Sequence, residues 1–227
     1  MTEQTLLTAE NLHLTFGETK ALDGASLHVR AGEVVALMGP SGSGKSTLLH
    51  CLAGIMAPES GRVVYDGRDL TAMSDTERST LRRGEFGFVF QFGQLVPELT
   101  CRENVALPLR LSGVGRREAH RTATSWLERL DVADVADKRP GQASGGQGQR
   151  VAVARALVTQ PRVVFADEPT GALDSLNGEL VMKMFIAAAR ETGAAVVLVT
   201  HEPRVAAYSN REAVVRDGRV REQEFAR

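Results

Sequence analysis

A short glycine-rich segment carries the residues best suited to chemistry in this chain. It spans Gly39 to Thr47 and reads GPSGSGKST. A glycine, four residues, a second glycine, a lysine and a serine or threonine form the pattern of a phosphate-binding loop. Glycine permits the turn and the close approach through which backbone N–H groups converge on a triphosphate. Lys45 can then reach the β- and γ-phosphates, and the Ser46 hydroxyl can hold Mg²⁺.

The neighbours of this segment fit the same interpretation. Residues 33–38 read as a short strand buried on both faces, and residues 46–53 place leucines at helical spacing. A helix that begins near Lys45 adds the positive end of its dipole to an anion site. The alternative is a glycine-rich turn without a ligand, and the matching strand and helix favour nucleotide binding over it.

Two more buried strands end in side chains that can do chemistry. Residues 163–166 lead into Asp167 and Glu168, and residues 194–200 lead into His201. Burying two carboxylates is costly unless something compensates for their charge, and a metal ion would do so. Ligands of open α/β sheets bind at the carboxyl ends of the strands. We therefore expect the phosphate loop, the carboxylate pair and His201 to lie on one sheet edge.

Two further features are weaker when each is taken alone. Residues 141–150 form a second glycine-rich turn that opens a helix, which is an anion site in principle. Phe16 ends a strand of alternating apolar residues. It is either an ordinary core aromatic or a flat partner on which a base could stack, and the residues alone leave both interpretations open.

The elements that must position these residues alternate between strands and helices. We predict further strands over residues 12–16, 26–29, 61–65 and 86–90, a helix over 74–81 and a hairpin over 213–221. Residues 100–130 are arginine-rich and helical, and they read as a helical sub-lobe inserted between strands. Its apolar stripe consists of Ala119, Ala123, Trp126, Leu127 and Leu130. A helix over 175–191 places Leu176, Leu180, Met184 and Ala188 on one side.

Composition excludes several classes of protein. Lys and Arg number 27 against 28 Asp and Glu, so no basic excess indicates a nucleic-acid partner. No apolar run approaches the roughly 20 residues that span a bilayer, and the start lacks a signal segment. Cys51 and Cys101 offer neither zinc spacing nor a disulfide framework. We expect a cytosolic protein, or one that a partner holds at a membrane.

In their order along the chain, these motifs resemble those of an ABC ATPase. The matching segments are the phosphate loop, Gln91, residues 144–147, residues 163–168, residues 172–174 and His201, and they cover nearly the whole chain. The resemblance implies one α/β domain over residues 1–227 of the P-loop NTPase (RecA-like) class. Its mostly parallel core would comprise residues 1–91 and 151–227, with an N-terminal antiparallel β subdomain. The inserted α-helical subdomain, about 92–150, would carry the signature motif.

The resemblance also implies ATP and Mg²⁺ as ligands and a role for each matching residue. Gln91 would contact Mg²⁺ and move with the transporter, Asp167 would assist Mg²⁺, and Glu168 would be the general base. Lys45 and His201 would stabilise the γ-phosphate, and Phe16 falls where the family stacks an aromatic under adenine. The remaining ATP contacts would come from the loop residues Gly39, Ser41, Gly42, Ser43, Gly44, Ser46 and Thr47. The signature residues Ser144, Gly145, Gly146 and Gln147 would bind ATP held by a second copy of the chain, with Asp174 at the dimer seam.

Three positions depart from the family pattern without removing a reacting group. Ala143 stands where leucine is usual, Gly148 where a longer polar residue is usual, and Gly171 where many members have serine. The first two flank the signature residues 144–147 and bear on the strength of the dimer contact.

Residues 90–109 narrow the resemblance to the ATPases of the macrolide-exporter and lipoprotein-release group, which includes the FtsE branch. This implies an ATPase at the cytoplasmic face of the membrane that closes as a homodimer around two ATP. It would drive a permease docked near Phe92–Leu109, in an exporter of drugs, antimicrobial peptides or lipid-linked substrates. The alternatives are an FtsE-like regulatory ATPase without transport and an importer ATPase of the amino-acid type.

Overall fold

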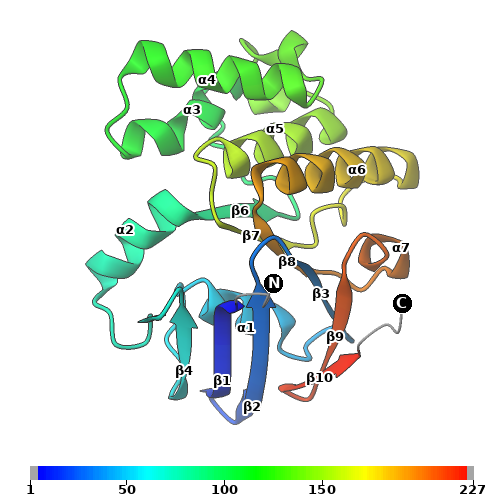
Figure 1. The fold of residues 1–227 in the computed structure, drawn as a ribbon. Coiled ribbons are helices and arrows are strands. Elements are labelled where there is room, and N and C mark those ends of the chain that lie inside the picture. The colour runs from blue at the N-terminus through cyan, green and yellow to red at the C-terminus, as the bar shows by residue number, and fades with distance from the viewer. Residues whose placement is uncertain (1–4, 224–227) are drawn as a thin grey trace. The chain divides into compact units, whose positions relative to one another are not determined.

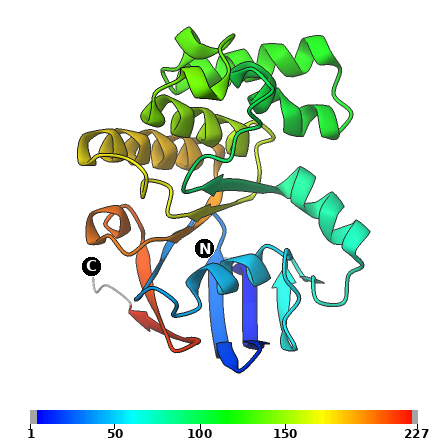
Figure 2. The same ribbon diagram turned by 180° about the vertical axis from the view of Figure 1, so that it is seen from behind.

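The computed structural model describes residues 5–223, which fall into two compact units. The first contains residues up to 82 together with those from 195 onward, and the second contains residues 83–194. The chain passes from the first to the second within helix α2 (Asp75–Glu85). Figures 1 and 2 show the elements from opposite sides. Within the described residues, every helix is too short or too polar to cross a lipid bilayer.

An antiparallel sheet of order β2-β1-β4-β5 forms one part of the first unit. Its strands are β1 (Thr5–Phe16), β2 (Thr19–Arg30), β4 (Ser60–Tyr65) and β5 (Arg68–Asp69). Leu12 and Leu14 of β1 point into the core, as the alternating pattern predicts. β1 and β2 both begin earlier than predicted. In β1, polar residues such as Thr8 and Glu10 interrupt the apolar pattern of its first half.

The central strand of the first unit is β3 (Val34–Met38). It runs parallel to β8 (Ala195–Val199) on one side and to β9 (Arg211–Arg216) on the other. β3 and β8 are almost completely buried, which explains why their apolar runs identified them in the sequence. β9 turns into the antiparallel β10 (Arg219–Gln223), as the predicted hairpin requires. The short helix α7 (Pro203–Ala206) lies between β8 and β9 in the chain.

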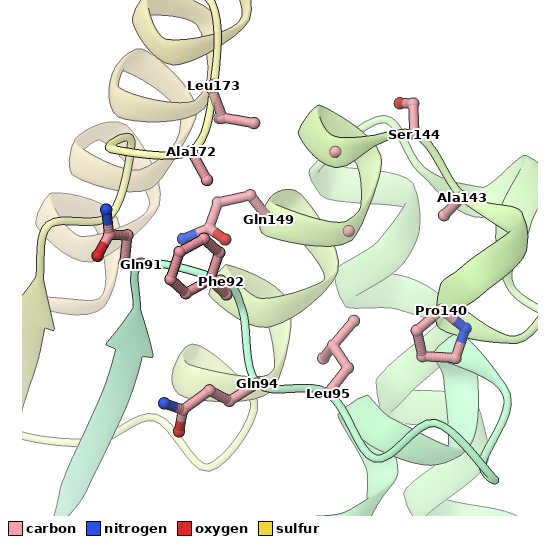
Figure 3. A pocket seen from close by; sticks show the side chains of 12 residues that line it. Gln91, Phe92, Gln94, Leu95, Pro140, Ala143, Ser144, Gln149, Ala172 and Leu173 are labelled. Carbon is pink, nitrogen blue, oxygen red and sulfur yellow. The ribbon is translucent and has the colours of Figure 1, made fainter.

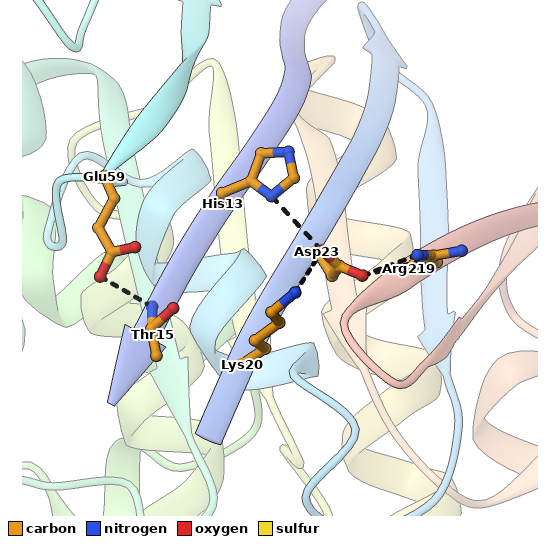
Figure 4. Close-up of polar contacts among 6 residues, drawn as sticks. All are labelled: His13, Thr15, Lys20, Asp23, Glu59 and Arg219. Carbon is orange, nitrogen blue, oxygen red and sulfur yellow. Dashed lines mark hydrogen bonds and ion pairs between the residues drawn. The ribbon is translucent and has the colours of Figure 1, made fainter. Parts of the chain in front are cut away.

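The tip of the β9–β10 hairpin is fastened to β2 (Figure 4). The Asp23 carboxylate accepts from Arg219 Nη2 at 2.8 Å, and the Asp23 N–H donates to the Gly218 carbonyl at 2.9 Å. The hydrogen bond from Arg219, followed by the charge of Lys20, lowers the pKa of Asp23. The hairpin tip is thus held beside the start of β2, where it also meets the phosphate loop.

The second unit combines a parallel strand pair with helices. β6 (Phe86–Phe90) pairs with β7 (Val163–Asp167), and the unit's main helices are α3 (Cys101–Leu111), α4 (Arg116–Arg129), α5 (Gly145–Leu157) and α6 (Ser175–Thr192). Two short 3₁₀ turns, η1 (Ala133–Val135) and η2 (Pro140–Gln142), lead into α5. A Cβ on Gly87 would lie 2.3 Å from the Ala156 carbonyl oxygen, so β6 and α5 approach each other closely only because residue 87 is glycine.

The predicted helical sub-lobe corresponds to α3 and α4, which lie side by side in both views (Figures 1 and 2). Thr100 and Glu103 form a capping box that begins α3. The predicted apolar stripe of α4 is buried, including Trp126. The break between the two helices falls at residues 112–115, where Gly113 and Gly115 interrupt the helical pattern.

The buried face of α6 differs from the side singled out in the sequence. Leu176 is 82% exposed and Leu180 is also exposed. The face that packs into the core instead carries Val181, Met182, Phe185, Ile186, Ala188 and Ala189. This second stripe is longer and bulkier, and it lies on a different side of the helix from Leu176 and Leu180. Ala188 is the one member of the predicted set that is buried.

Candidate functional site

The phosphate loop connects β3 to α1 (Lys45–Leu52) and is pressed against its neighbours in the first unit. A Cβ added to Gly39 would lie 2.1 Å from the Val215 carbonyl oxygen, and one added to Gly44 would lie 2.2 Å from the Ala21 carbonyl oxygen. Both glycines have φ angles that favour glycine, 144° and 103°. Backbone oxygens cannot move aside as a flexible side chain can, so β2 and β9 fix the shape of the loop.

A buried positive charge sits inside this loop. The Lys45 ammonium donates to the carbonyl oxygens of Gly39 at 3.0 Å and Pro40 at 2.7 Å, and the residue is only 8% exposed. The Ser43 hydroxyl oxygen is buried and has no hydrogen-bond partner within the described chain. No acidic residue occupies the first turn of α1. Neutral carbonyls do not neutralise the ammonium, so these residues fit an anionic ligand such as a nucleotide phosphate.

Phe16 and His201 belong to the same unit as the loop. The Phe16 side chain is 49% exposed, so its interpretation as a core aromatic is wrong. An exposed ring keeps a face available for a flat partner. β8 ends at Val199, and Thr200, whose N–H donates to the Leu37 carbonyl at 3.2 Å, separates it from His201. Because β3 and β8 are parallel neighbours, the loop and His201 leave the sheet at the same edge.

The second unit brings Gln91 together with the two carboxylates. Phe90 and Asp167 are register partners in the parallel pair β6–β7, so the residues that follow both strands emerge at the same end. Glu168 has a φ of 47°, which is uncommon for a residue with a side chain. Such a conformation costs about 1–3 kcal/mol and is found preferentially at functional sites. A hydrogen bond of 3.0 Å from the Gly171 N–H to the Glu168 carbonyl closes the turn that holds it.

Two side chains of α5 anchor the loop that carries Gln91, and the sequence reasoning missed both. The Gln149 amide donates to the Phe90 carbonyl at 2.9 Å. Arg155 donates from Nη2 to the Gly93 carbonyl and from Nη1 to the Gln94 carbonyl, each at 2.7 Å. Burial lowers the pKa of Arg155. For Arg155, a charged side chain within the apolar run of a buried helix was the available signal, whereas Gln149 lies among the other polar residues of the glycine-rich segment 141–150 and stood out by no such signal.

The signature residues begin α5 and cap it. The Ser144 hydroxyl accepts from the Gln147 N–H at 3.2 Å, and the Gln147 side chain accepts from the Ser144 N–H at 3.0 Å. Ser144 and Gly145 are exposed, whereas Gly146 is buried against Asn177. Asp174 caps α6 by accepting from the N–H groups of Leu176 and Asn177, and the bond from Asn177 is the main reason that its pKa is lowered.

A pocket of about 290 Å³ lies beside α5 in the second unit (Figure 3). We call it the α5 pocket; its lining consists of Gln91, Phe92, Gln94, Leu95, Pro140, Ala143, Ser144, Gly145, Gly148, Gln149, Ala172 and Leu173. Phe92 is 76% exposed, so it presents apolar surface at this pocket. Ala143 and Gly148, two of the departures from the family pattern, both line it. Ala143 has only a methyl group and Gly148 has no side chain, and a Cβ added to Gly148 would meet nothing within 4 Å, so both positions leave space beside the pocket.

Residues 22–171 match a family model described as ABC transporter. This chain belongs to the ABC transporter ATP-binding family. It is therefore an ABC-type ATPase with the α/β architecture of that family, a mostly parallel sheet with an antiparallel β subdomain. ATP is the nucleotide of this family.

Several relatives of this ABC ATPase are similar over most of its length. The uncharacterized ABC transporter ATP-binding protein YknY of Bacillus subtilis is 45% identical over 91% of this chain and 88% of its own. The lipoprotein-releasing system ATP-binding protein LolD of Hyphomonas neptunium is 43% identical over 92% of this chain and 91% of its own. The macrolide export ATP-binding/permease protein MacB of Brucella melitensis is 45% identical over 88% of this chain, which corresponds to 31% of MacB.

Solved structures of ABC cassettes share the fold. The dimeric structure of MJ0796, a bacterial ABC transporter cassette, superposes with a TM-score of 0.90 at 39% identity, covering 98% of this chain and all of that one. A dimeric post-hydrolysis state of the same cassette bound to ADP and Pi gives a TM-score of 0.89 at 38% identity over the same shares.

Proposed function

We propose that this ABC ATPase powers an exporter of the macrolide-export and lipoprotein-release group. In this proposal the chain closes as a homodimer around two ATP and drives a membrane permease. The observation that carries the proposal is the buried Lys45 ammonium, which is held by carbonyl oxygens in a loop that backbone contacts fix in shape. The likeness to LolD and MacB supports the assignment to this group.

Nucleotide binding is assigned to the first unit. Residues 39–47 surround the phosphates, with Gly42, Gly44 and Lys45 donating backbone N–H groups. The Lys45 ammonium exchanges its two carbonyl partners for the β- and γ-phosphate oxygens, which are charged and therefore bind it more strongly. The half-exposed ring of Phe16 stacks on the adenine.

Hydrolysis is assigned to Glu168, Lys45 and His201. Glu168 orients a water molecule and takes its proton as the water oxygen attacks the γ-phosphorus, while the bond to the bridging oxygen breaks and ADP leaves. Lys45 and His201 stabilise the charge on the transferred phosphoryl group. Ser46, Gln91 and Asp167 would hold Mg²⁺, which supplies further charge neutralisation when bound. A hydroxyl, an amide and one carboxylate are oxygen donors of the kind that Mg²⁺ takes alongside phosphates.

The exposed position of the signature supports the proposed dimer. Ser144 and Gly145 lie at the surface at the start of α5, where the N–H groups of a helix favour an anion. We assign Ser144, Gly145, Gly146 and Gln147 to the γ-phosphate of the ATP held by a second copy, and Asp174 to the seam between the copies. The dimeric MJ0796 cassette supports this arrangement.

The permease is assigned to the segment Phe92–Leu109, at the cytoplasmic face of the membrane. Exposed Phe92 and the α5 pocket provide an apolar surface directly after Gln91. A change at the γ-phosphate that moves Gln91 would therefore reach the docked permease through a few residues.

Reconstitution tests the proposal. The chain should be purified with the membrane protein encoded beside its gene and placed in lipid vesicles, with ATP supplied on the side of the ATPase. We expect ATP-dependent movement of a macrolide or release of a lipidated protein, and no movement with Glu168→Gln. Hydrolysis without movement of either substrate class would favour a regulatory ATPase. Inward movement of a polar amino acid would favour an importer.

A further inference from the structure

The segment that follows β7 passes directly against the Gln91 side chain at Gly171. A Cβ placed on Gly171 would lie 2.8 Å from Gln91 Nε2, 3.3 Å from Cδ and 3.4 Å from Cγ. The first of these distances is shorter than a side-chain carbon tolerates, so the amide occupies space that any other residue at position 171 would claim. Figure 3 shows the Gln91 amide beside the ribbon that continues into Ala172.

The same glycine is bonded to the residue assigned as the general base. Its N–H donates to the Glu168 carbonyl at 3.0 Å and closes the turn over residues 168–171. Within that turn Glu168 has its left-handed backbone and Thr170 is buried. Gly171 therefore makes room for the Gln91 side chain, because it has no Cβ, and it holds the Glu168 backbone through its N–H.

We propose that Gly171 is a positioning residue that sets the place of the Gln91 amide against the turn carrying Glu168. The inference rests on the proposed function, in which Gln91 senses the nucleotide and Glu168 activates water. A side chain at position 171 displaces the amide while it leaves the backbone turn intact. The reaction then proceeds with Gln91 shifted relative to Glu168.

The backbone of Gly171 distinguishes this role from a purely structural one. Its φ lies outside the left-handed region, so a residue with a side chain can adopt its conformation. The atoms it would meet belong to the far end of a flexible side chain. At Gly39 and Gly44, by contrast, the nearest atoms are backbone oxygens. Alanine or serine at position 171 should therefore move Gln91 without unfolding the protein.

The position of the amide can be measured without any activity. In NMR spectra of the ¹⁵N-labelled full chain, the side-chain NH₂ signal of Gln91 is assigned as the signal that disappears in the Gln91→Ala variant. We expect Gly171→Ala to shift this signal at an unchanged melting temperature. Gly84→Ala is the control, because a Cβ there meets nothing within 4 Å. An unmoved Gln91 signal in folded Gly171→Ala would overturn the proposal.

A double-mutant cycle on ATP hydrolysis tests the consequence. We expect Gly171→Val, which is bulkier than the serine found at this position in many family members, to lower kcat by roughly tenfold, as loss of an outer-shell partner does at metal sites, with little change in KM for ATP. In the Gln91→Ala background the same change should have no further effect. An equal loss in both backgrounds, or none in the first, would refute action through Gln91. If the wild-type chain hydrolyses no ATP, the proposed function fails, while the NMR signal still decides the role of Gly171.

Discussion

At the scale of single residues, the site depends on charges that are held before any ligand arrives. Lys45 is buried with two neutral carbonyls as partners, and Glu168 is held in a conformation that costs free energy. The Lys45 ammonium favours a ligand that carries negative charge. The backbone of Glu168 fixes the direction in which its side chain meets such a ligand. Glycine is required at positions 39 and 44, because backbone oxygens occupy the place of a Cβ.

Lys45→Ala should abolish tight ATP binding. A hydrogen bond to a charged group is worth about 1.5–3 kcal/mol, so the dissociation constant should rise by roughly 10- to 100-fold. Titration with a fluorescent ATP analogue gives the number. Lys183→Ala on the exposed side of α6 is the matched control. Unchanged affinity in Lys45→Ala would show that the phosphates bind elsewhere.

Glu168→Gln should keep ATP binding and stop hydrolysis, because the amide preserves size and hydrogen bonding but cannot take a proton. The unhydrolysed ATP should then hold two copies together. Size-exclusion chromatography with ATP and Mg²⁺ should show a dimer for this variant and a monomer for Glu128→Gln, an exposed change on α4. A hydrolysis rate equal to that of the wild type would remove Glu168 from its assigned role.

At the scale of elements, the sequence predicted what is local and missed what depends on tertiary contacts. The phosphate loop, the buried strands β3, β7 and β8, and the stripe of α4 were predicted because neighbouring residues specify them. The exposed face of α6 was not, because two apolar stripes compete on that helix and packing decides between them. The hydrogen bonds from Arg155 span 61 and 62 positions in the chain, and no local pattern reports them.

Arg155→Lys should loosen the loop that carries Gln91. A lysine has one nitrogen and lacks the planar fork that lets Arg155 bond the Gly93 and Gln94 carbonyls together. We expect a loss of about 1–2 kcal/mol in unfolding free energy and faster hydrogen exchange at residues 92–95. Arg121→Lys, at an exposed position of α4, is the control. Equal exchange in the two variants would mean that the loop is held by other contacts.

At the scale of the whole molecule, the proposal requires partners, because the signature residues serve the nucleotide of another copy. A monomer would leave Ser144 and Gly145 exposed and unused. The permease similarly requires a surface that the isolated chain leaves open, and the exposed Phe92 provides apolar surface at the start of the proposed segment.

Ser144→Arg should block hydrolysis without weakening ATP binding to one chain. The bulky side chain obstructs closure, whereas the phosphate loop of the same chain remains intact. Mixing this variant with Lys45→Ala should restore part of the activity, because one composite site then has an intact loop facing an intact signature. Nucleotide titration and steady-state hydrolysis measure the two effects. Loss of ATP affinity in the Ser144→Arg monomer would mean that the site is complete within a single chain.

Charged substitutions beside the α5 pocket should weaken permease binding. Phe92→Glu places a carboxylate on exposed apolar surface, and Leu95→Glu and Leu99→Glu do so at half-buried positions of the same segment. Burying an unpaired carboxylate against a partner is costly, so co-purification with the permease in detergent should fall while the free subunit hydrolyses ATP at an unchanged rate. Ile55→Glu places the same charge on an exposed apolar residue of the first unit and should leave co-purification unchanged. Undiminished co-purification of folded Phe92→Glu would move the docking surface elsewhere. Unfolding of the two leucine variants alone would assign Leu95 and Leu99 to the core and leave Phe92 as the contact.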